Sequence, residues 1–273
     1  MRVEDYLQRI GVTGPVTRDL AGLTTLHRAH LGAIPYENLD VQLGRPVTTD
    51  VPAILDKVIG RKRGGWCYEM NGTLGWALGE LGFNVTRATG AVMREFKGEP
   101  AQGNHLVLRV ELPEGLYLAD VGFGDGPLDP IRIAPGAFQS GGFTFKIEQA
   151  DTNWWRLRHH ATGSAPCFDF HLERAREALL SERCAFLQTS PMSPFVQNLV
   201  VQRFVPGAVL ILRGRVLRRV TPDSVTDIVL DNADQLLTTL SEDFALDVPE
   251  AATLWPKILE RHEAVMQART PGA

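Results

Sequence analysis

The sequence predicts an α+β protein built from three consecutive regions. Three observations support this prediction. Apolar residues recur at helical spacing over residues 1–84, they alternate as in strands from residue 85 onward, and strands followed by helices occupy residues 198–273. No repeat, low-complexity tract or long Gly/Ser linker interrupts the chain. We therefore expect domains at residues 1–84, 85–197 and 198–273 that pack tightly on one another.

The first region is predicted to be helical because its apolar residues form single stripes at helical spacing. Thr49 and Asp50 are suited to cap a helix that begins at Val51, and the pattern stops before Gly64-Gly65. The predicted helices cover approximately residues 18–31, 51–58 and 67–81.

The middle region is predicted to be a small barrel or sandwich of strands. His105–Leu112 and Tyr117–Val121 flank Pro113-Glu114-Gly115, and a second hairpin is centred on residues 151–153. In the last region, strands are expected at 209–212 and 216–220, and helices at 231–240 and 251–266.

Composition and charge restrict the kind of protein. Of the 273 residues, 44% are hydrophobic and 22% charged, as in a globular protein that buries a core. With 28 basic and 32 acidic side chains the net charge is −4, so we expect no nucleic-acid partner. No apolar run approaches the roughly 18 residues of a membrane span, and charges follow Met1 where a signal peptide is apolar. We expect a soluble cytoplasmic protein with no membrane partner.

The three cysteines must be considered as single thiols. Cys67, Cys167 and Cys184 are too few for a disulfide framework and lack zinc-finger spacing, so we expect no metal site. A lone cysteine is usually a small buried apolar residue. Cys67, however, follows Gly64-Gly65 at the first turn of a predicted helix, where main-chain amides and the helix dipole favour a thiolate. Cys67 is thus the candidate nucleophile.

A thiolate nucleophile needs a base and a group that orients the base. His105 opens a predicted strand, and Asp120 lies among the apolar residues of the next one. If the turn is centred between Leu112 and Pro113, the two residues face each other. If Pro113-Glu114-Gly115 forms the turn, they share a face but lie several residues apart. A hydrogen-bonded strand histidine and a carboxylate near a turn are the alternatives.

Five local motifs closely resemble those of the arylamine N-acetyltransferases. The most specific is Arg63–Asn71, which contains Cys67, and it is followed by His105 and by Asp120–Gly124. The other two are Ile34–Leu39 and Ser193–Phe195.

This resemblance implies a helical N-terminal bundle, a middle β-barrel and a C-terminal α/β lid. It also implies a cysteine-protease-like triad of Cys67, His105 and Asp120. The triad would move acetyl from acetyl-coenzyme A, through a thioester, to an arylamine, hydrazine or N-hydroxyarylamine, without a metal. Trp66 and Tyr68 depart from the commoner family residues, which bears on substrate preference.

The resemblance also suggests binding residues. Gly124 and Gly126 would offer backbone amides to the phosphates of coenzyme A. Tyr36, Phe123 and Phe195 would line an aromatic pocket for the amine, although core packing explains each of them equally well.

Two pairs of residues lie outside the expected chemistry. Glu37 and Arg63 are assigned to a structural ion pair that holds the glycine turn. His159-His160 has no carboxylate at ligand spacing and is left without a role.

Three other functions remain open at this point. A cysteine hydrolase of the transglutaminase or papain-like kind shares the order Cys, His, Asp but passes its acyl group to water. An amide synthase of the same family would act on a polyketide or other acyl chain instead of acetyl-coenzyme A. A non-catalytic small-molecule binding protein would have no need of the triad. The acceptor amine and the oligomeric state are not determined by the sequence.

Overall fold

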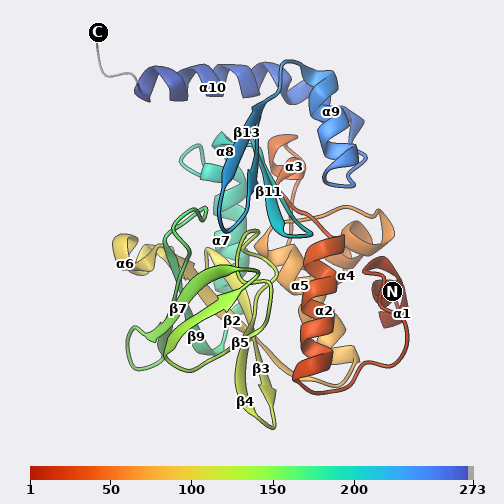
Figure 1. Cartoon of the computed structure of the whole chain (residues 1–273), viewed down its shortest axis with the longest axis vertical. Helices are drawn as coiled ribbons and strands as arrows, with labels where there is room; N and C mark the ends of the chain where they lie inside the picture. Colours follow the sequence, from red (N-terminus) through yellow and green to blue (C-terminus); the bar gives the residue numbers. More distant parts are fainter. Residues whose placement is uncertain (270–273) are drawn as a thin grey trace.

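The structure, a computed structural model, describes residues 1–269 and begins with helices that pack beside two sheets (Figure 1). The three helices expected in this region are present, with bounds shifted by a few residues, and Asp50 caps one of them by accepting from the amide of Ala53. The elements are α1 (Val3–Arg9), α2 (Leu20–Ala33), α3 (Leu39–Gln42), α4 (Val51–Leu55), the π-helical turn η1 (Asp56–Gly60) and α5 (Cys67–Glu80).

The middle of the chain forms an antiparallel sheet of eight strands that curls around part of the core (Figure 1). Its order is β5-β4-β3-β2-β9-β8-β7-β6, and the edge strands β5 and β6 do not pair, so the sheet is a half-barrel and not the closed barrel expected. The strands are β2 (Asn84–Val92), β3 (His105–Leu112), β4 (Gly115–Ala119), β5 (Ile131–Arg132), β6 (Gly136–Ser140), β7 (Phe143–Gln149), β8 (Trp154–Arg158) and β9 (Cys167–Arg174).

Four short or medium helices complete this part of the chain and were absent from the sequence prediction. Between β2 and β3 lie α6 (Arg94–Lys97) and the turn η2 (Glu99–Ala101), and after β9 come α7 (Glu177–Thr189) and α8 (Pro194–Gln197). In α7 only Leu180, Cys184 and Leu187 are buried, and this narrow apolar stripe explains why the helix was missed.

The C-terminal region contains a second antiparallel sheet, of order β1-β10-β11-β12-β13. Its first strand, β1 (Tyr36–Glu37), comes from the helical region and pairs with β10, which joins the helical region to the C-terminal sheet. The other elements are β10 (Val200–Val205), β11 (Ala208–Arg213), β12 (Val216–Val220), β13 (Val225–Val229), α9 (Ala233–Glu242), η3 (Pro249–Leu254) and α10 (Trp255–Arg269).

The β3–β4 hairpin determines where His105 and Asp120 lie. Leu112 pairs with Gly115, so the turn consists of Pro113 and Glu114 alone. This register differs from both alternatives considered above. Asp120 lies one residue beyond the end of β4, not inside the strand as predicted, because pairing ends at Ala119. In this register the two residues are offset by two positions on one face of the hairpin, which makes them diagonal neighbours.

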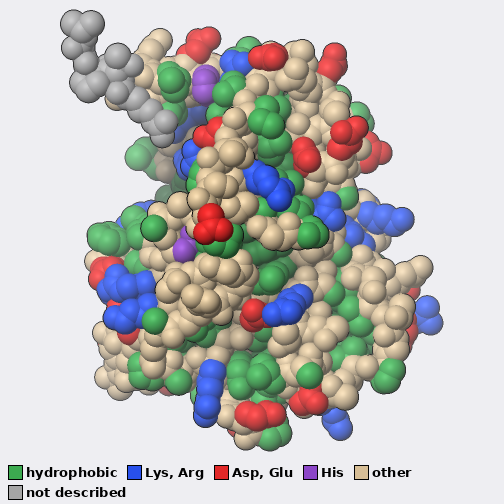
Figure 2. All heavy atoms as spheres, viewed as in Figure 1, with side chains coloured by type: hydrophobic (Ala, Val, Ile, Leu, Met, Phe, Trp, Pro, Cys, Tyr) green, Lys and Arg blue, Asp and Glu red, His purple; other side chains and the backbone are tan. Residues whose placement is uncertain are grey.

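The surface carries both signs of charge. On the face drawn in Figure 2, Lys and Arg side chains lie among Asp and Glu side chains and do not gather into one large basic area. Within residues 1–269, no helix combines the length and the apolar character that crossing a bilayer requires.

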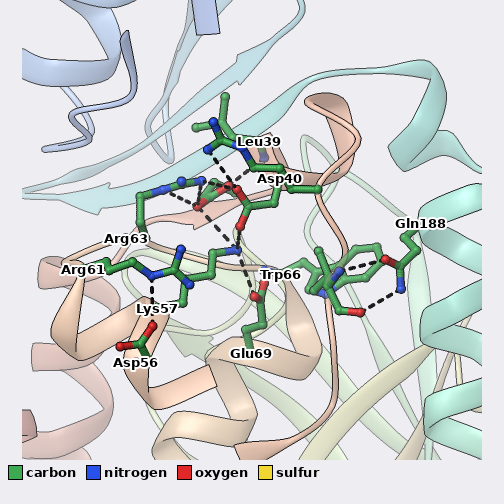
Figure 3. A network of polar contacts seen from close by, with 12 residues as sticks. Leu39, Asp40, Asp56, Lys57, Arg61, Arg63, Trp66, Glu69 and Gln188 are labelled. Atoms are coloured by element: carbon green, nitrogen blue, oxygen red, sulfur yellow. Dashed lines mark hydrogen bonds and ion pairs between the residues drawn. The ribbon is translucent and has the colours of Figure 1, made fainter. Parts of the chain in front are cut away.

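A buried cluster of charges joins α3, η1 and the start of α5 (Figure 3). The ammonium nitrogen of Lys57 lies 2.8 Å from an Asp40 oxygen and 2.9 Å from a Glu69 oxygen. Arg63 lies 2.7 Å from a Glu37 oxygen, which confirms the predicted ion pair. Burial raises the pKa of Glu69 to about 7, although Lys57 opposes this effect. The cluster therefore brings three carboxylates and two cations out of water together.

We predict that Lys57→Met destabilises the protein by about 3–5 kcal/mol, because Asp40 and Glu69 would remain buried without their nearest cation. Urea unfolding at about pH 8 measures this loss. The loss should shrink at about pH 6, since the raised pKa of Glu69 allows this carboxyl to be protonated there and to need no cation.

The exposed pair Arg61–Asp56 provides the control. Arg61→Ala should cost less than about 1 kcal/mol, as for other surface ion pairs. Equal losses for Lys57→Met and Arg61→Ala would contradict a structural role for the buried cluster.

Candidate active site

Cys67 is the first residue of α5 and follows a glycine turn that packs too closely for any other residue. A Cβ atom on Gly64 would lie 2.0 Å from the carbonyl oxygen of Pro35, and one on Gly65 would lie 2.6 Å from the Glu69 carboxylate. The same carboxylate accepts a hydrogen bond of 3.1 Å from the main-chain nitrogen of residue 66, which caps the helix. The turn thus determines where the helix begins.

The Cys67 thiol is buried, with only 2% of the residue exposed. Its sulfur lies 3.9 Å from the carbonyl oxygen of Asn104, the residue before His105. Burial raises the pKa of the thiol, and a main-chain hydrogen bond from Leu106 opposes this only in part. This direction is opposite to the one predicted from the helix start, because loss of solvent outweighs the helix amides. The thiol therefore needs a nearby base before it can act as a nucleophile.

His105 and Asp120 form a buried hydrogen bond, and His105 follows Asn104, whose carbonyl oxygen lies near the thiol. Nε2 of His105 lies 2.7 Å from Oδ2 of Asp120, which leaves Nδ1 as the other ring nitrogen for proton exchange. The second oxygen of Asp120 accepts from Nδ2 of Asn71 at 2.7 Å and from the amide of Gly122 at 2.9 Å. Burial raises the pKa of Asp120, but the charge of His105 and these hydrogen bonds outweigh it, so the net pKa lies below its ordinary value.

Asn71 is a site residue to which sequence reasoning assigned no role. Besides Asp120, its Nδ2 donates to the carbonyl oxygen of Leu106 at 2.6 Å, and its Oδ1 accepts from the amide of Val121 at 3.0 Å. Asn71 lies one helical turn after Cys67, so both side chains emerge from the same face of α5. The sequence could have indicated this position, because Asn71 follows Cys67 by four residues.

His27 is a second site residue that the sequence analysis did not predict. Its Nε2 accepts from the amide of Asp120 at 3.2 Å, and its Nδ1 lies 3.0 Å from the carbonyl oxygen of Leu128. Both contacts are satisfied by a neutral ring protonated on Nδ1. Burial lowers the pKa of His27, which agrees with the neutral form.

Aromatic rings surround the imidazole of His105. Phe123, predicted to contact the amine, meets the His105 ring edge to face at a centroid distance of 5.7 Å, and Phe168 does so at 5.2 Å. Phe168 was not predicted at the site. The two rings lie 4.9 Å apart and leave the imidazole little freedom to turn.

The other two aromatic residues predicted for the amine pocket lie near the glycine turn. Phe195 is partly exposed, and its ring lies 5.2 Å from that of Trp66, the residue before Cys67. Tyr36 is buried, and its main chain bridges to Gly65. The structure therefore places Tyr36 and Phe195 beside the start of α5, and Phe123 beside His105.

Gly124 and Gly126, the predicted coenzyme contacts, lie in the loop after β4. Gly124 has a φ of +91°, and a Cβ atom there would lie 1.8 Å from the side-chain oxygen of Gln202. Packing thus requires glycine at this position whatever ligand binds. Gly126 is less constrained, since a Cβ atom there would lie 3.2 Å from Cβ of Phe123. Their contact with coenzyme A remains a prediction.

We predict that Asp120→Asn lowers turnover by on the order of 10³- to 10⁴-fold. The partners of the Asp120 carboxylate are donors from Asn71, Gly122 and His105, so an amide NH₂ group would face a donor. Steady-state kinetics measure the loss, and Asp227→Asn, at an exposed ion pair, is the control.

The same substitution should also change the pH dependence of stability. Because the folded-state pKa of Asp120 is lowered, its contribution is present above the ordinary value of 3.8 and is lost as pH falls below it. Urea unfolding should therefore show a difference between wild type and Asp120→Asn that narrows toward acid pH. Unchanged turnover and stability would contradict the placement of Asp120.

Comparison with known proteins identifies the family. A family model described as N-acetyltransferase matches residues 19–253. The arylamine N-acetyltransferase of Mycolicibacterium smegmatis is 35% identical over 268 residues, which cover 92% of this chain and 94% of that protein. The arylamine N-acetyltransferase / N-hydroxyarylamine O-acetyltransferase of Salmonella typhimurium is 31% identical, covering 83% and 82%.

Solved structures agree with the sequence comparison. The structure of Mycobacterium marinum arylamine N-acetyltransferase in complex with CoA superimposes with a TM-score of 0.84 at 31% identity, covering 96% of this chain and 99% of that one. The match therefore extends over both sheets and the helices that carry the site. The chain belongs to the arylamine N-acetyltransferase family.

Proposed function

We propose that this enzyme moves an acetyl group from acetyl-coenzyme A to an arylamine, hydrazine or N-hydroxyarylamine by a ping-pong reaction. Cys67, His105 and Asp120 would act as a triad of the cysteine-protease kind. The observation that carries the proposal is the buried 2.7 Å hydrogen bond between His105 and Asp120, which Asn71 joins to the helix that begins at Cys67. Family membership supports acetyl-coenzyme A as the donor.

In the first half-reaction, the Cys67 thiol gives its proton to Nδ1 of His105. The sulfur attacks the acetyl carbonyl carbon, the carbon–sulfur bond to coenzyme A breaks, and the departing thiolate takes the proton from His105. Because burial raises the pKa of the thiol, this proton transfer depends on Asp120, whose negative charge stabilises the imidazolium. Main-chain amides in the first turn of α5 would stabilise the oxyanion.

In the second half-reaction, the amine attacks the thioester carbon on Cys67. His105 accepts the proton that the amine loses and returns it to the sulfur as the new amide departs. Since coenzyme A has left by then, donor and acceptor can use the same space. Phe123, Phe195 and Tyr36 would offer ring faces to an aromatic amine, and Gly124 and Gly126 would offer amides to the coenzyme.

The experiment that tests this proposal is incubation with acetyl-coenzyme A followed by intact-mass analysis and peptide mapping. We expect one added acetyl group on Cys67 in the wild type and none in Cys67→Ala, because the variant lacks the thiol that His105 would activate. Cys184→Ala, which removes a different buried thiol, should be acetylated like the wild type. Turnover by Cys67→Ala above a few per cent of the wild-type rate would contradict the proposal.

Initial rates distinguish the ping-pong route from direct transfer. With acetyl-coenzyme A varied at several fixed concentrations of an arylamine, double-reciprocal lines should be parallel. Intersecting lines without an acetyl-enzyme would indicate a ternary complex. An acetyl-enzyme that loses its acetyl group to water at the same rate with or without amines would indicate a hydrolase. Failure to acetylate Cys67 while another acyl donor succeeds would indicate an amide synthase.

A further inference from the structure

Asp125, His159 and His160 come together although nothing in the sequence spacing connects them. Asp125 lies in the loop after β4, and the two histidines follow the end of β8. One potential metal-binding atom from each side chain lies within 4.8 Å of the other two. The carboxylate that the histidine pair lacks in sequence is therefore supplied by the fold.

Three of the four histidine ring nitrogens in this cluster are buried and without hydrogen-bond partners, whereas Nδ1 of His160 lies 2.9 Å from the hydroxyl oxygen of Thr162. Among the described residues, both ring nitrogens of His159 and Nε2 of His160 make no hydrogen bond. The side chain of His159 is 0% exposed, and its Nε2 lies 3.7 Å from Oδ1 of Asp125. Leaving buried polar atoms without partners is costly, so one such nitrogen from each histidine beside a carboxylate indicates that a ligand completes the cluster.

Asp125 is already held in position for such a role. The residue is 1% exposed, and its carboxylate accepts hydrogen bonds of 2.7 Å from both the amide and the hydroxyl of Ser164. Hydrogen bonds of this kind orient carboxylates that bind metals.

We propose that Asp125, His159 and His160 bind one divalent transition-metal ion of the zinc class. Two imidazole nitrogens and one carboxylate oxygen are ligands that Zn²⁺ and Co²⁺ accept, and water would fill the fourth position. The acetyl transfer proposed above uses no metal, so this site would regulate the enzyme and would not take part in the chemistry.

The position of the cluster connects it to the active site through Phe123. The Phe123 ring lies 5.2 Å from that of His159 on one side and 5.7 Å from that of His105 on the other. Asp125 is two residues farther along the same loop. A metal bound here would fix this loop beside the imidazole, and we expect it to slow acetyl transfer.

The test measures Co²⁺ binding by its visible absorption, with the Cys67→Ala protein used so that the reactive thiol is not a ligand. We expect one Co²⁺ per chain, displaced by Zn²⁺. His160→Gln in this background should weaken binding by more than about tenfold, the smallest loss typical when even an outer partner of a metal site is removed. Asp125→Asn should weaken it similarly while keeping an oxygen toward Ser164.

His262→Gln, which removes a histidine from α10, is the matched control and should bind Co²⁺ like its parent. Thermal melting without metal confirms that each variant is folded, and added Zn²⁺ should raise the Tm of the parent but not of folded His160→Gln. The metal site would be overturned if Cys67→Ala bound no Co²⁺, or if folded His160→Gln and Asp125→Asn in this background bound Co²⁺ as tightly as their Cys67→Ala parent. Neither result would affect the acetyl-enzyme experiment.

Discussion

The arrangement of this active site depends on the side-chain amide of Asn71. This side chain projects from α5, the helix that carries Cys67. It forms hydrogen bonds with the Asp120 carboxylate, the Leu106 carbonyl oxygen and the Val121 amide. It thereby ties the helix of Cys67 to the β3–β4 hairpin and the residue after it, which supply the imidazole of His105 and the carboxylate of Asp120. Because all these atoms are buried, loss of the amide would leave several polar groups without a partner at once.

The start of α5 is fixed by charged side chains. Glu69 caps α5 through one oxygen and contacts Lys57 through the other, so the buried ion cluster determines where the helix starts. Gly64 and Gly65 then allow the chain to pass close to Pro35 and Glu69. The cluster, the glycine turn and the Asn71 amide are successive constraints on a single segment of chain, and the position of the thiol follows from all three.

The sequence predicted much of this site because local chemistry determined it. The glycine turn, the helix that starts at Cys67 and the strand that starts at His105 follow from local pattern. The hairpin register did not, since a two-residue turn and a three-residue turn fit the same residues. The raised pKa of the thiol also escaped prediction, because burial is a property of the whole fold. Likewise, only the fold brings Asp125 to the histidine pair.

We expect Asn71 to couple the Cys67 thiol to the His105–Asp120 pair. The most direct measurement is the pH dependence of alkylation at Cys67, followed by peptide mass, in wild type and Asn71→Ala. Releasing Asp120 weakens its support of the imidazolium, so we expect a higher apparent pKa for alkylation in the variant. Asn84→Ala, at an exposed asparagine, should leave this pKa unchanged. Identical profiles for wild type and folded Asn71→Ala would contradict it.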